Sequence, residues 1–195
     1  MKIAAIHDTC LTIEPNHFLY KSLSNWSCNL FVGCGHGCPA CYVPDTSTNK
    51  MKKRLAVYGV ADPIAEWGHY TLVRPWDECA FTNSLRNAED TPLAGLNPDG
   101  NRAVFFCSTS DPYQVIGHAD PEKAKLLMFH ARSLRRKALT AILEHSTLNV
   151  RILTRSPLAR EDFDLLKRFG NRLMLGISLP PWDTRLPKIS EPMAP

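Results

Sequence analysis

Short apolar runs alternate with longer segments of helical periodicity in the second half of the chain. Residues 103–107 form a continuous apolar run, which is typical of a strand buried on both faces. Further strands are predicted at residues 149–153 and 172–179. Between the first two strands, apolar residues at helical spacing predict a long helix over residues 121–145. Asp120 is in position to cap that helix, and a proline follows at its first position.

A second helix is predicted over residues 156–170, because Ser156-Pro157 suits a helix start and Phe169-Gly170 a helix end. The order of strand, helix, strand, helix and strand is typical of parallel βα units. The first half of the chain is less regular. Its predicted elements are a short strand at 1–6, a strand at 25–32, a short strand at 70–74, a helix at 77–87 and a loop at 91–101.

These elements predict an α/β fold with two parts. Residues 1–24 are expected to be an irregular lead-in, and residues 25–195 to form the core domain. Four strands are counted that carry the cysteine loop and its successors, and the chain then ends in Pro180-Pro181-Trp182 and a polar tail. No helix is left to cover the last strand. We therefore expect a truncated chain, or a partner that supplies the remainder of the fold.

The composition is that of an ordinary globular protein, with 44% hydrophobic and 22% charged residues among 195. The net charge of +4 permits a polyanionic partner without indicating one. No apolar run approaches the roughly 18 residues that cross a membrane, and the N-terminal apolar stretch is too short for a signal peptide. We expect a cytoplasmic protein. Seven cysteines, an odd number, then point to metal or redox use rather than a disulfide framework.

Three of these cysteines fall within eight residues, in the run Cys34-Gly-His-Gly-Cys38-Pro-Ala-Cys41. Thiolates at this density hold soft metals or iron–sulfur clusters. Glycines at positions 33, 35 and 37 make the loop pliable enough to fold around such a group. A structural zinc site is the alternative, with His36 or a more distant cysteine, Cys10 or Cys28, as fourth ligand. Such sites usually combine two short cysteine hooks, and the second hook is absent here.

The cysteine loop and its surroundings resemble the radical S-adenosylmethionine enzymes. The run Gly33-Cys34-Gly-His36-Gly-Cys38-Pro-Ala-Cys41-Tyr42 is similar to the loop of the spore photoproduct lyase-like branch, also called DNA repair photolyase-like. Three later segments, each after a predicted strand, are similar to that branch and occur in its order. They are Ser108-Thr-Ser-Asp111-Pro-Tyr-Gln114, Leu153-Thr-Arg155-Ser-Pro-Leu158 and Gly176-Ile-Ser178-Leu-Pro180. The likeness spans about residues 25–192.

The resemblance implies a partial parallel (β/α) barrel that stops after about four βα units. It implies that Cys34, Cys38 and Cys41 hold a 4Fe-4S cluster whose fourth iron binds S-adenosylmethionine. A reduced cluster would cleave this compound and start radical chemistry of lyase type, with a nucleic-acid lesion as the implied substrate. An electron donor resembling flavodoxin or ferredoxin is implied as a partner. The candidates for the cofactor pocket are Tyr42, Ser108, Ser110, Thr154, Arg155 and Ser178.

Most of the pocket candidates follow predicted parallel strands, at the end where α/β folds place their ligands. Arg155 is suited to the methionyl carboxylate of the cofactor. The alternatives are a solvated arginine, and ordinary turn or strand-end hydroxyls for the serines. The chain departs from the family at Ala40, where an aromatic residue usually packs near the adenine. That packing is then looser, or is provided by Tyr42.

Two further features have alternative interpretations. Cys107 lies one residue before the slot where spore photoproduct lyases carry a hydrogen-donating cysteine, and buried packing is the preferred interpretation. The basic run from Arg132 to Lys137 is interpreted as the solvated face of the long helix, with nucleic-acid contact as the alternative. For the whole chain, a zinc- or cluster-stabilised nucleic-acid-binding module and an inactive fragment of a longer radical enzyme remain as rival hypotheses.

Overall fold

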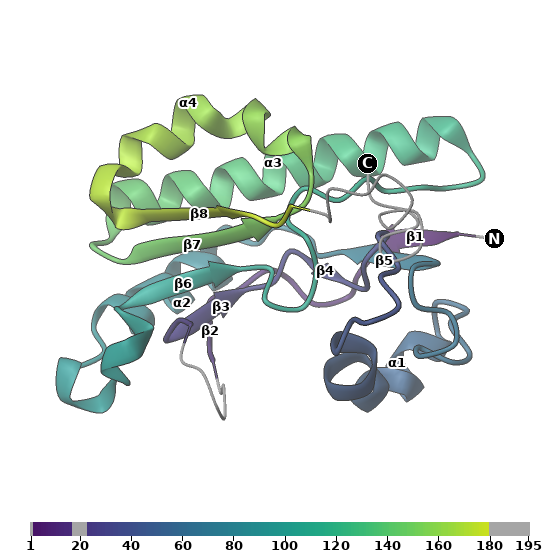
Figure 1. The fold of residues 1–195 in the computed structure, drawn as a ribbon, viewed down its shortest axis with the longest axis horizontal. Coiled ribbons are helices and arrows are strands. Elements are labelled where there is room, and N and C mark those ends of the chain that lie inside the picture. Colours follow the sequence, from purple (N-terminus) through teal and green to yellow (C-terminus); the bar gives the residue numbers. More distant parts are fainter. Residues whose placement is uncertain (1, 17–22, 180–195) are drawn as a thin grey trace.

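The computed structural model describes residues 2–16 and 23–179, which build two β-sheets with helices around them (Figure 1). The larger sheet has five strands in the order β2-β3-β6-β7-β8. Strand β2 pairs antiparallel with β3, and the other four strands are mutually parallel. The strands are β2 (Glu14–Pro15), β3 (Trp26–Cys28), β6 (Ala103–Phe106), β7 (Asn149–Thr154) and β8 (Leu173–Ile177).

The smaller sheet has three strands in the order β1-β5-β4. Strand β1 (Ile3–Ile6) runs parallel to β5 (Tyr70–Val73), and β4 (Phe31–Val32) runs antiparallel to β5. The single strand predicted at residues 25–32 is therefore two strands, β3 and β4, in different sheets. The two residues between them redirect the backbone, because Leu30 O accepts a hydrogen bond from Arg74 N at the end of β5. Pairing with a distant segment decides this break.

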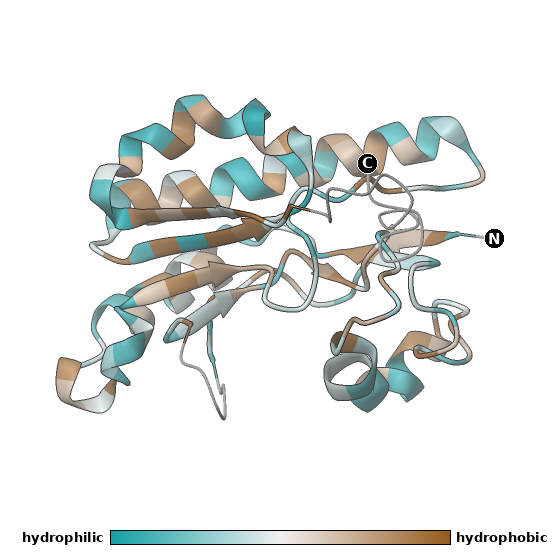
Figure 2. Ribbon diagram, in the orientation of Figure 1, coloured by the Kyte–Doolittle hydropathy of each residue, from teal (hydrophilic) through white to brown (hydrophobic). Residues whose placement is uncertain are grey.

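The long helix α3 (Pro121–His145) has the predicted bounds and packs against elements of both sheets. Its cap is also confirmed, since the Asp120 carboxylate accepts hydrogen bonds from the backbone N–H groups of Glu122 and Lys123. Figure 2 shows brown and teal residues alternating along α3 and brown residues along β6, β7 and β8. The apolar face of α3 includes Leu127 and Leu134, which are buried in a core shared with both sheets.

The other predicted helices have mixed outcomes. Helix α2 (Glu78–Glu89) confirms the helix predicted at residues 77–87, and Asp77 caps it. The helix predicted over residues 156–170 is instead three short pieces: the 3-10 helix η5 (Pro157–Asp162), α4 (Phe163–Leu166) and the 3-10 helix η6 (Lys167–Arg172). Ion pairs to α3 hold this segment, because Asp162 turns inward and is fully buried. Gly170, at φ 55°, adds a kink within η6.

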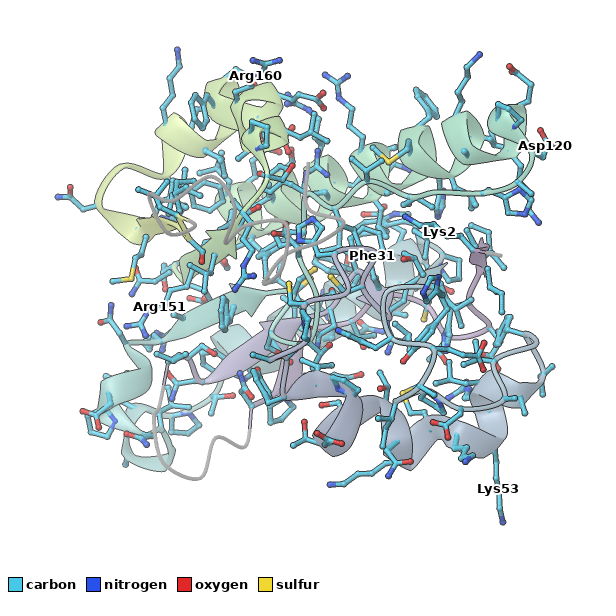
Figure 3. The ribbon with its side chains drawn as sticks, turned by 45° about the vertical axis from the view of Figure 1, so that its right-hand side comes forward. Lys2, Phe31, Lys53, Asp120, Arg151 and Arg160 are labelled. Atoms are coloured by element: carbon cyan, nitrogen blue, oxygen red, sulfur yellow. The ribbon has the colours of Figure 1, made fainter. Side chains whose placement is uncertain are left out.

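Residues 44–69, for which no element was predicted, carry the π-helix η1 (Pro44–Thr48), the 3-10 helix η2 (Asn49–Met51) and α1 (Lys52–Ala56). Leu55 of α1 packs with residues of the three-stranded sheet in a small second core. The predicted loop at 91–101 contains only two 3-10 turns, η3 (Leu93–Gly95) and η4 (Pro98–Gly100). In Figure 3, Lys53 of α1 and Arg160 of η5 project outward on opposite sides of the molecule.

The structure confirms a mixed α/β fold that contains parallel strands. Residues 2–16 add a strand to each sheet, whereas the division at residue 24 stays a prediction. The predicted tail from Pro180 onward lies outside the described residues. Within the described ranges, no helix is long and apolar enough to cross a membrane.

Candidate functional site

A cavity of about 420 Å³ opens at the carboxyl ends of β6, β7 and β8. Four parts of the chain form most of its wall: the cysteine loop after β4, the segment that follows β6, the end of β7 and the end of β8. Leu23 and Trp67 complete the lining. All nine residues that the sequence singled out line this one cavity. They are Cys34, Cys38, Cys41, Tyr42, Ser108, Ser110, Thr154, Arg155 and Ser178.

The cysteine loop is tightly folded. Gly33 has φ +88° and Gly37 φ +60°, in the left-handed region where glycine is favoured. At Gly33 a Cβ atom would also lie only 2.4 Å from the Tyr70 carbonyl oxygen, so a side chain cannot fit. Cys34 is buried, and this burial raises the pKa of its thiol to about 12. Burial also raises the pKa of Cys41. Without a bound cation, these two thiols therefore favour the protonated form.

Gln114 fixes the cysteine loop from the segment that follows β6. Its side-chain oxygen accepts a hydrogen bond from Gly35 N at 2.6 Å and another from the Thr71 hydroxyl at 3.2 Å. Its side-chain nitrogen donates to the Gly33 carbonyl at 3.5 Å. Gln114 itself is buried. In the sequence, Gln114 is only the last residue of the Ser108–Gln114 motif. A single glutamine after a strand does not indicate that it anchors a distant loop.

Asp111 joins three walls of the cavity. One carboxylate oxygen accepts hydrogen bonds from Tyr113 N at 2.8 Å and from the Thr154 hydroxyl at 2.7 Å. The other accepts from Arg155 N at 2.8 Å and lies 3.7 Å from His36 Nδ1 in the cysteine loop. Asp111 is thus the residue that holds β7 against both the cysteine loop and the segment after β6. The sequence placed it in a motif without giving it a function.

The hydroxyl candidates have different surroundings. The Thr154 hydroxyl donates to Asp111 and also accepts from Ser156 N at 3.0 Å, so it stabilises the wall of the cavity. The Ser108 hydroxyl donates to Asn29. Ser110 and Ser178 are only partly buried and line the cavity.

Two aromatic residues line the cavity on the side of the cysteine loop. Tyr42 is exposed, and its hydroxyl donates to the Ser108 carbonyl at 2.9 Å, which connects the loop to the end of β6. Trp67, which the sequence interpretation left out, also lines the cavity and meets the Tyr70 ring edge-on. Ala40 is part of the same wall. Because the Ala40 side chain is small, Tyr42 and Trp67 provide the aromatic surface on this side of the cavity.

Arg155 reaches the cysteine loop with its side chain. Its Nη1 donates a hydrogen bond to the Cys38 sulfur at 3.0 Å. Its positive charge also acts on Cys41, where it partly counters the rise in thiol pKa caused by burial. The sequence had suggested a carboxylate ligand for this guanidinium. The structure shows it directed at a predicted metal ligand.

Cys107 also lines the cavity, at the end of β6. It has φ 56°, a backbone conformation that is uncommon for a residue other than glycine. The side chain is buried, and burial raises the pKa of its thiol to about 12. Its backbone N–H donates to the Cys28 carbonyl. The burial of Cys107 agrees with a packing role. Its place in the cavity wall leaves open the alternative role of a hydrogen-donating cysteine.

The donor chemistry of the cavity fits a metal–sulfur group. Three thiols from one glycine-containing loop line a space that strand ends bound on another side. Within residues 2–16 and 23–179, no three or more histidine, cysteine or acidic side chains are already gathered around a point that would hold a metal ion. Binding would therefore require the thiols to converge, and thiolates form together with metal binding.

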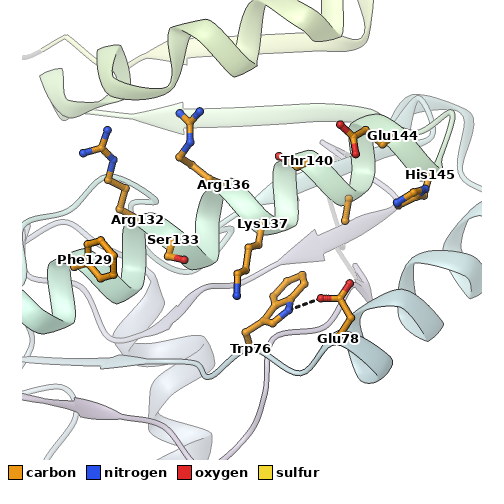
Figure 4. A pocket seen from close by; sticks show the side chains of 11 residues that line it. Trp76, Glu78, Phe129, Arg132, Ser133, Arg136, Lys137, Thr140, Glu144 and His145 are labelled. Carbon is orange, nitrogen blue, oxygen red and sulfur yellow. Dashed lines mark hydrogen bonds between the residues drawn. The ribbon is translucent and has the colours of Figure 1, made fainter.

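The basic run on α3 proves to be largely paired within the chain. Arg135 is buried, and its Nε lies 2.5 Å from Asp162, so the solvated-face interpretation is wrong for this residue. Arg136 contacts Asp162 at 2.9 Å and Asp164 at 2.7 Å. A groove of about 500 Å³ lies along this helix (Figure 4). There Lys137 points toward the Trp76 ring, 5.8 Å from its centre. Acidic partners thus neutralise two of the arginines expected to face solvent.

Comparison with known proteins gives one informative match. The chain is 31% identical over 188 residues to the uncharacterized protein ORF301 of Acidianus two-tailed virus. The match covers 95% of this chain and 52% of that protein, so the chain spans about half the length of this curated relative. No family model matches the chain. No solved structure matches it significantly either.

Proposed function

We propose that this chain carries the cluster- and cofactor-binding part of a radical S-adenosylmethionine enzyme of the spore photoproduct lyase-like branch. One observation carries the proposal: the three cysteines and all six pocket candidates, which are spread over residues 34–178, line a single cavity. The candidates were chosen from four separate segments of sequence. Their meeting at one end of a parallel sheet is the arrangement expected of a ligand site in an α/β fold.

The order of the strands supports the barrel part of the proposal. Strands β3, β6, β7 and β8 are parallel, and their order across the sheet follows their order along the chain, as in the first units of a (β/α) barrel. In sequence, β4 and β5 of the smaller sheet lie between β3 and β6. The cavity lies at the carboxyl ends of the last three, which is where such barrels carry their active sites. The match covers only 52% of the related viral protein. Any activity that needs a protein of that full length is therefore also part of the proposal.

In this proposal Cys34, Cys38 and Cys41 hold a 4Fe-4S cluster by three thiolates. When bound, such a cluster supplies the electron that splits S-adenosylmethionine into methionine and a 5′-deoxyadenosyl radical. The protein then has to hold the cofactor and exclude water. Ser110 and Ser178 offer hydroxyls, and Tyr42 and Trp67 offer aromatic surface to a planar base. Phe105 and Leu153 add apolar wall, which limits the access of water.

The partners belong to the same proposal. A reduced flavodoxin- or ferredoxin-like protein would supply the electron, and a nucleic-acid lesion is the substrate class that the resemblance favours. The paired arginines of α3 do not support that helix as the nucleic-acid contact. The part of the substrate that reacts would enter the cavity beside the cysteine loop.

A zinc-stabilised module is the second candidate, and one observation favours it. His36 is buried within the cysteine loop, and its Nδ1 lies 3.7 Å from the Asp111 carboxylate. A carboxylate beside a ring nitrogen is a common arrangement for a histidine that binds zinc through its other nitrogen. This candidate predicts a colourless protein with one zinc ion and no cleavage of S-adenosylmethionine.

Anaerobic reconstitution with iron and sulfide separates the two candidates. The wild-type chain should take up about four irons and four sulfides and show the brown colour of a 4Fe-4S cluster. Cys38→Ala should lose the cluster. Cys79→Ala is the matched control, because Cys79 is exposed on α2 and outside the cavity, and it should load normally. After reduction, the wild type and the control should release 5′-deoxyadenosine from S-adenosylmethionine. Retention of the cluster by Cys38→Ala, or loading with zinc alone, would overturn the proposal.

A further inference from the structure

Arg155 is connected both to the parallel sheet and to the cysteine loop. Its backbone N–H donates to the Asp111 carboxylate at 2.8 Å, directly after β7 ends at Thr154. The Thr154 hydroxyl donates to the same carboxylate at 2.7 Å. Two successive residues are therefore fixed on one buried acid. This anchoring leaves the Arg155 side chain with a defined starting point at the edge of the cavity.

From that anchor the guanidinium reaches the thiols. Its Nη1 lies 3.0 Å from the Cys38 sulfur, which is within the range of an N–H···S hydrogen bond. The cation thus contacts one of the three predicted cluster ligands directly.

Hydrogen bonds to ligand sulfurs are one of the means by which proteins set the reduction potential of iron–sulfur clusters. A donor that carries a positive charge withdraws negative charge from the sulfur and stabilises the more negative, reduced state of the cluster. A hydrogen bond from a neighbouring residue to a metal ligand also orients that ligand. The expected sign is therefore fixed: a cation on Cys38 makes the cluster easier to reduce.

We propose that Arg155 is a positioning residue that holds the Cys38 sulfur and raises the reduction potential of the cluster, in place of binding the methionyl carboxylate. The proposal rests on the function proposed above and deepens it. It gives the electron-transfer step a specific determinant outside the three ligands. It also predicts that the carboxylate of the cofactor is bound by other groups of the cavity.

The test compares Arg155→Gln, Arg155→Lys and a matched control, Arg160→Gln. Arg160 is exposed in η5 and projects away from the fold (Figure 3). Each reconstituted protein is measured for iron and sulfide content, for the midpoint potential by a redox titration followed by electron paramagnetic resonance, and for affinity toward S-adenosylmethionine. Arg155→Gln should lower the equilibrium constant for one-electron reduction about tenfold, which corresponds to about 59 mV. Arg155→Lys should recover part of this shift, and Arg160→Gln should match the wild type.

The outcomes separate this inference from the function on which it rests. A wild-type chain that binds no cluster overturns both. A wild type that loads normally, with an Arg155→Gln midpoint equal to its own, overturns only the role of Arg155. If the midpoint is unchanged and S-adenosylmethionine binds at least tenfold more weakly, Arg155 binds the methionyl carboxylate instead, and its proposed role is overturned. If Arg155→Gln fails to load, loading by Arg155→Lys supports the positioning role. Failure of both variants beside a normal control overturns it, because the cation that lysine retains should still hold the Cys38 sulfur.

Discussion

Replacing Gln114 by methionine removes the hydrogen bonds that fix the cysteine loop while keeping a side chain of similar length. The main loss is the acceptor for Gly35 N, at 2.6 Å in a buried position, because that N–H group is then left without a partner. Such a group costs about 1–3 kcal/mol, and the lost bond from the Thr71 hydroxyl adds about 0.5–1.5 kcal/mol. We expect the free energy of unfolding to fall by about 2–4 kcal/mol.

The assay is urea unfolding of the metal-free protein at neutral pH, with a thermal scan beside it. For a chain of this length, the expected loss corresponds to a melting temperature lower by about 4–16 °C. Asn83→Met is the control, because Asn83 is an exposed amide on α2, and its effect should stay within about 0.5 kcal/mol. A Gln114→Met protein that unfolds within about 0.5 kcal/mol of the wild type would refute the idea that this side chain anchors the loop. The experiment uses no metal, so its outcome does not depend on the proposed activity.

Two further predictions concern the ion pairs between α3 and the segment that follows β7. Asp162→Ala leaves the buried Arg135 unpaired and should cost about 3–5 kcal/mol in urea unfolding, and a loss below about 1 kcal/mol would contradict this account. For Asp164, the hydrogen bond from Arg136 lowers the pKa of the carboxyl to about 2. Its stabilising effect is therefore complete above its ordinary pKa of 3.8 and is lost as the pH falls toward 2. The difference in stability between the wild type and Asp164→Asn should be smaller at pH 3 than at pH 6, and an equal difference at both pH values would count against the depressed pKa.

The sequence predicted the regular elements of the second half of the chain well, because their signals are local. Helix α3 has a capping aspartate, a proline in its first turn and a long apolar face, and its bounds agree with the prediction. Strand β6 is a short apolar run, and β7 carries Val150, Ile152 and Leu153 among polar residues. The break between β3 and β4 was not predictable, since the bond from Arg74 N that redirects the chain comes from more than forty residues away. The irregular segment after β7 depends in the same way on a buried ion pair with α3.

The candidate site shows the same division. That the nine residues would gather could be inferred, because the carboxyl ends of neighbouring parallel strands meet at one edge of a sheet. What each side chain does there could not be inferred. Asp111 and Gln114 act through hydrogen bonds to partners that are distant in sequence. The direction of the Arg155 side chain depends on how its backbone is anchored, which no local pattern records.

The separation of Cys38 and Arg155 has a consequence for how the protein is made. They are 117 residues apart in the chain, and the carboxylate of Asp111 that anchors Arg155 is also synthesised long after the thiols. At about 5–20 residues per second, a ribosome needs roughly 6–23 s to travel that distance. During this interval the nascent chain presents three thiols without the residues that later enclose them. If a metal–sulfur group binds as proposed, its incorporation in the cell would then be a late event, completed only after β7, the third parallel strand of the larger sheet, has been added.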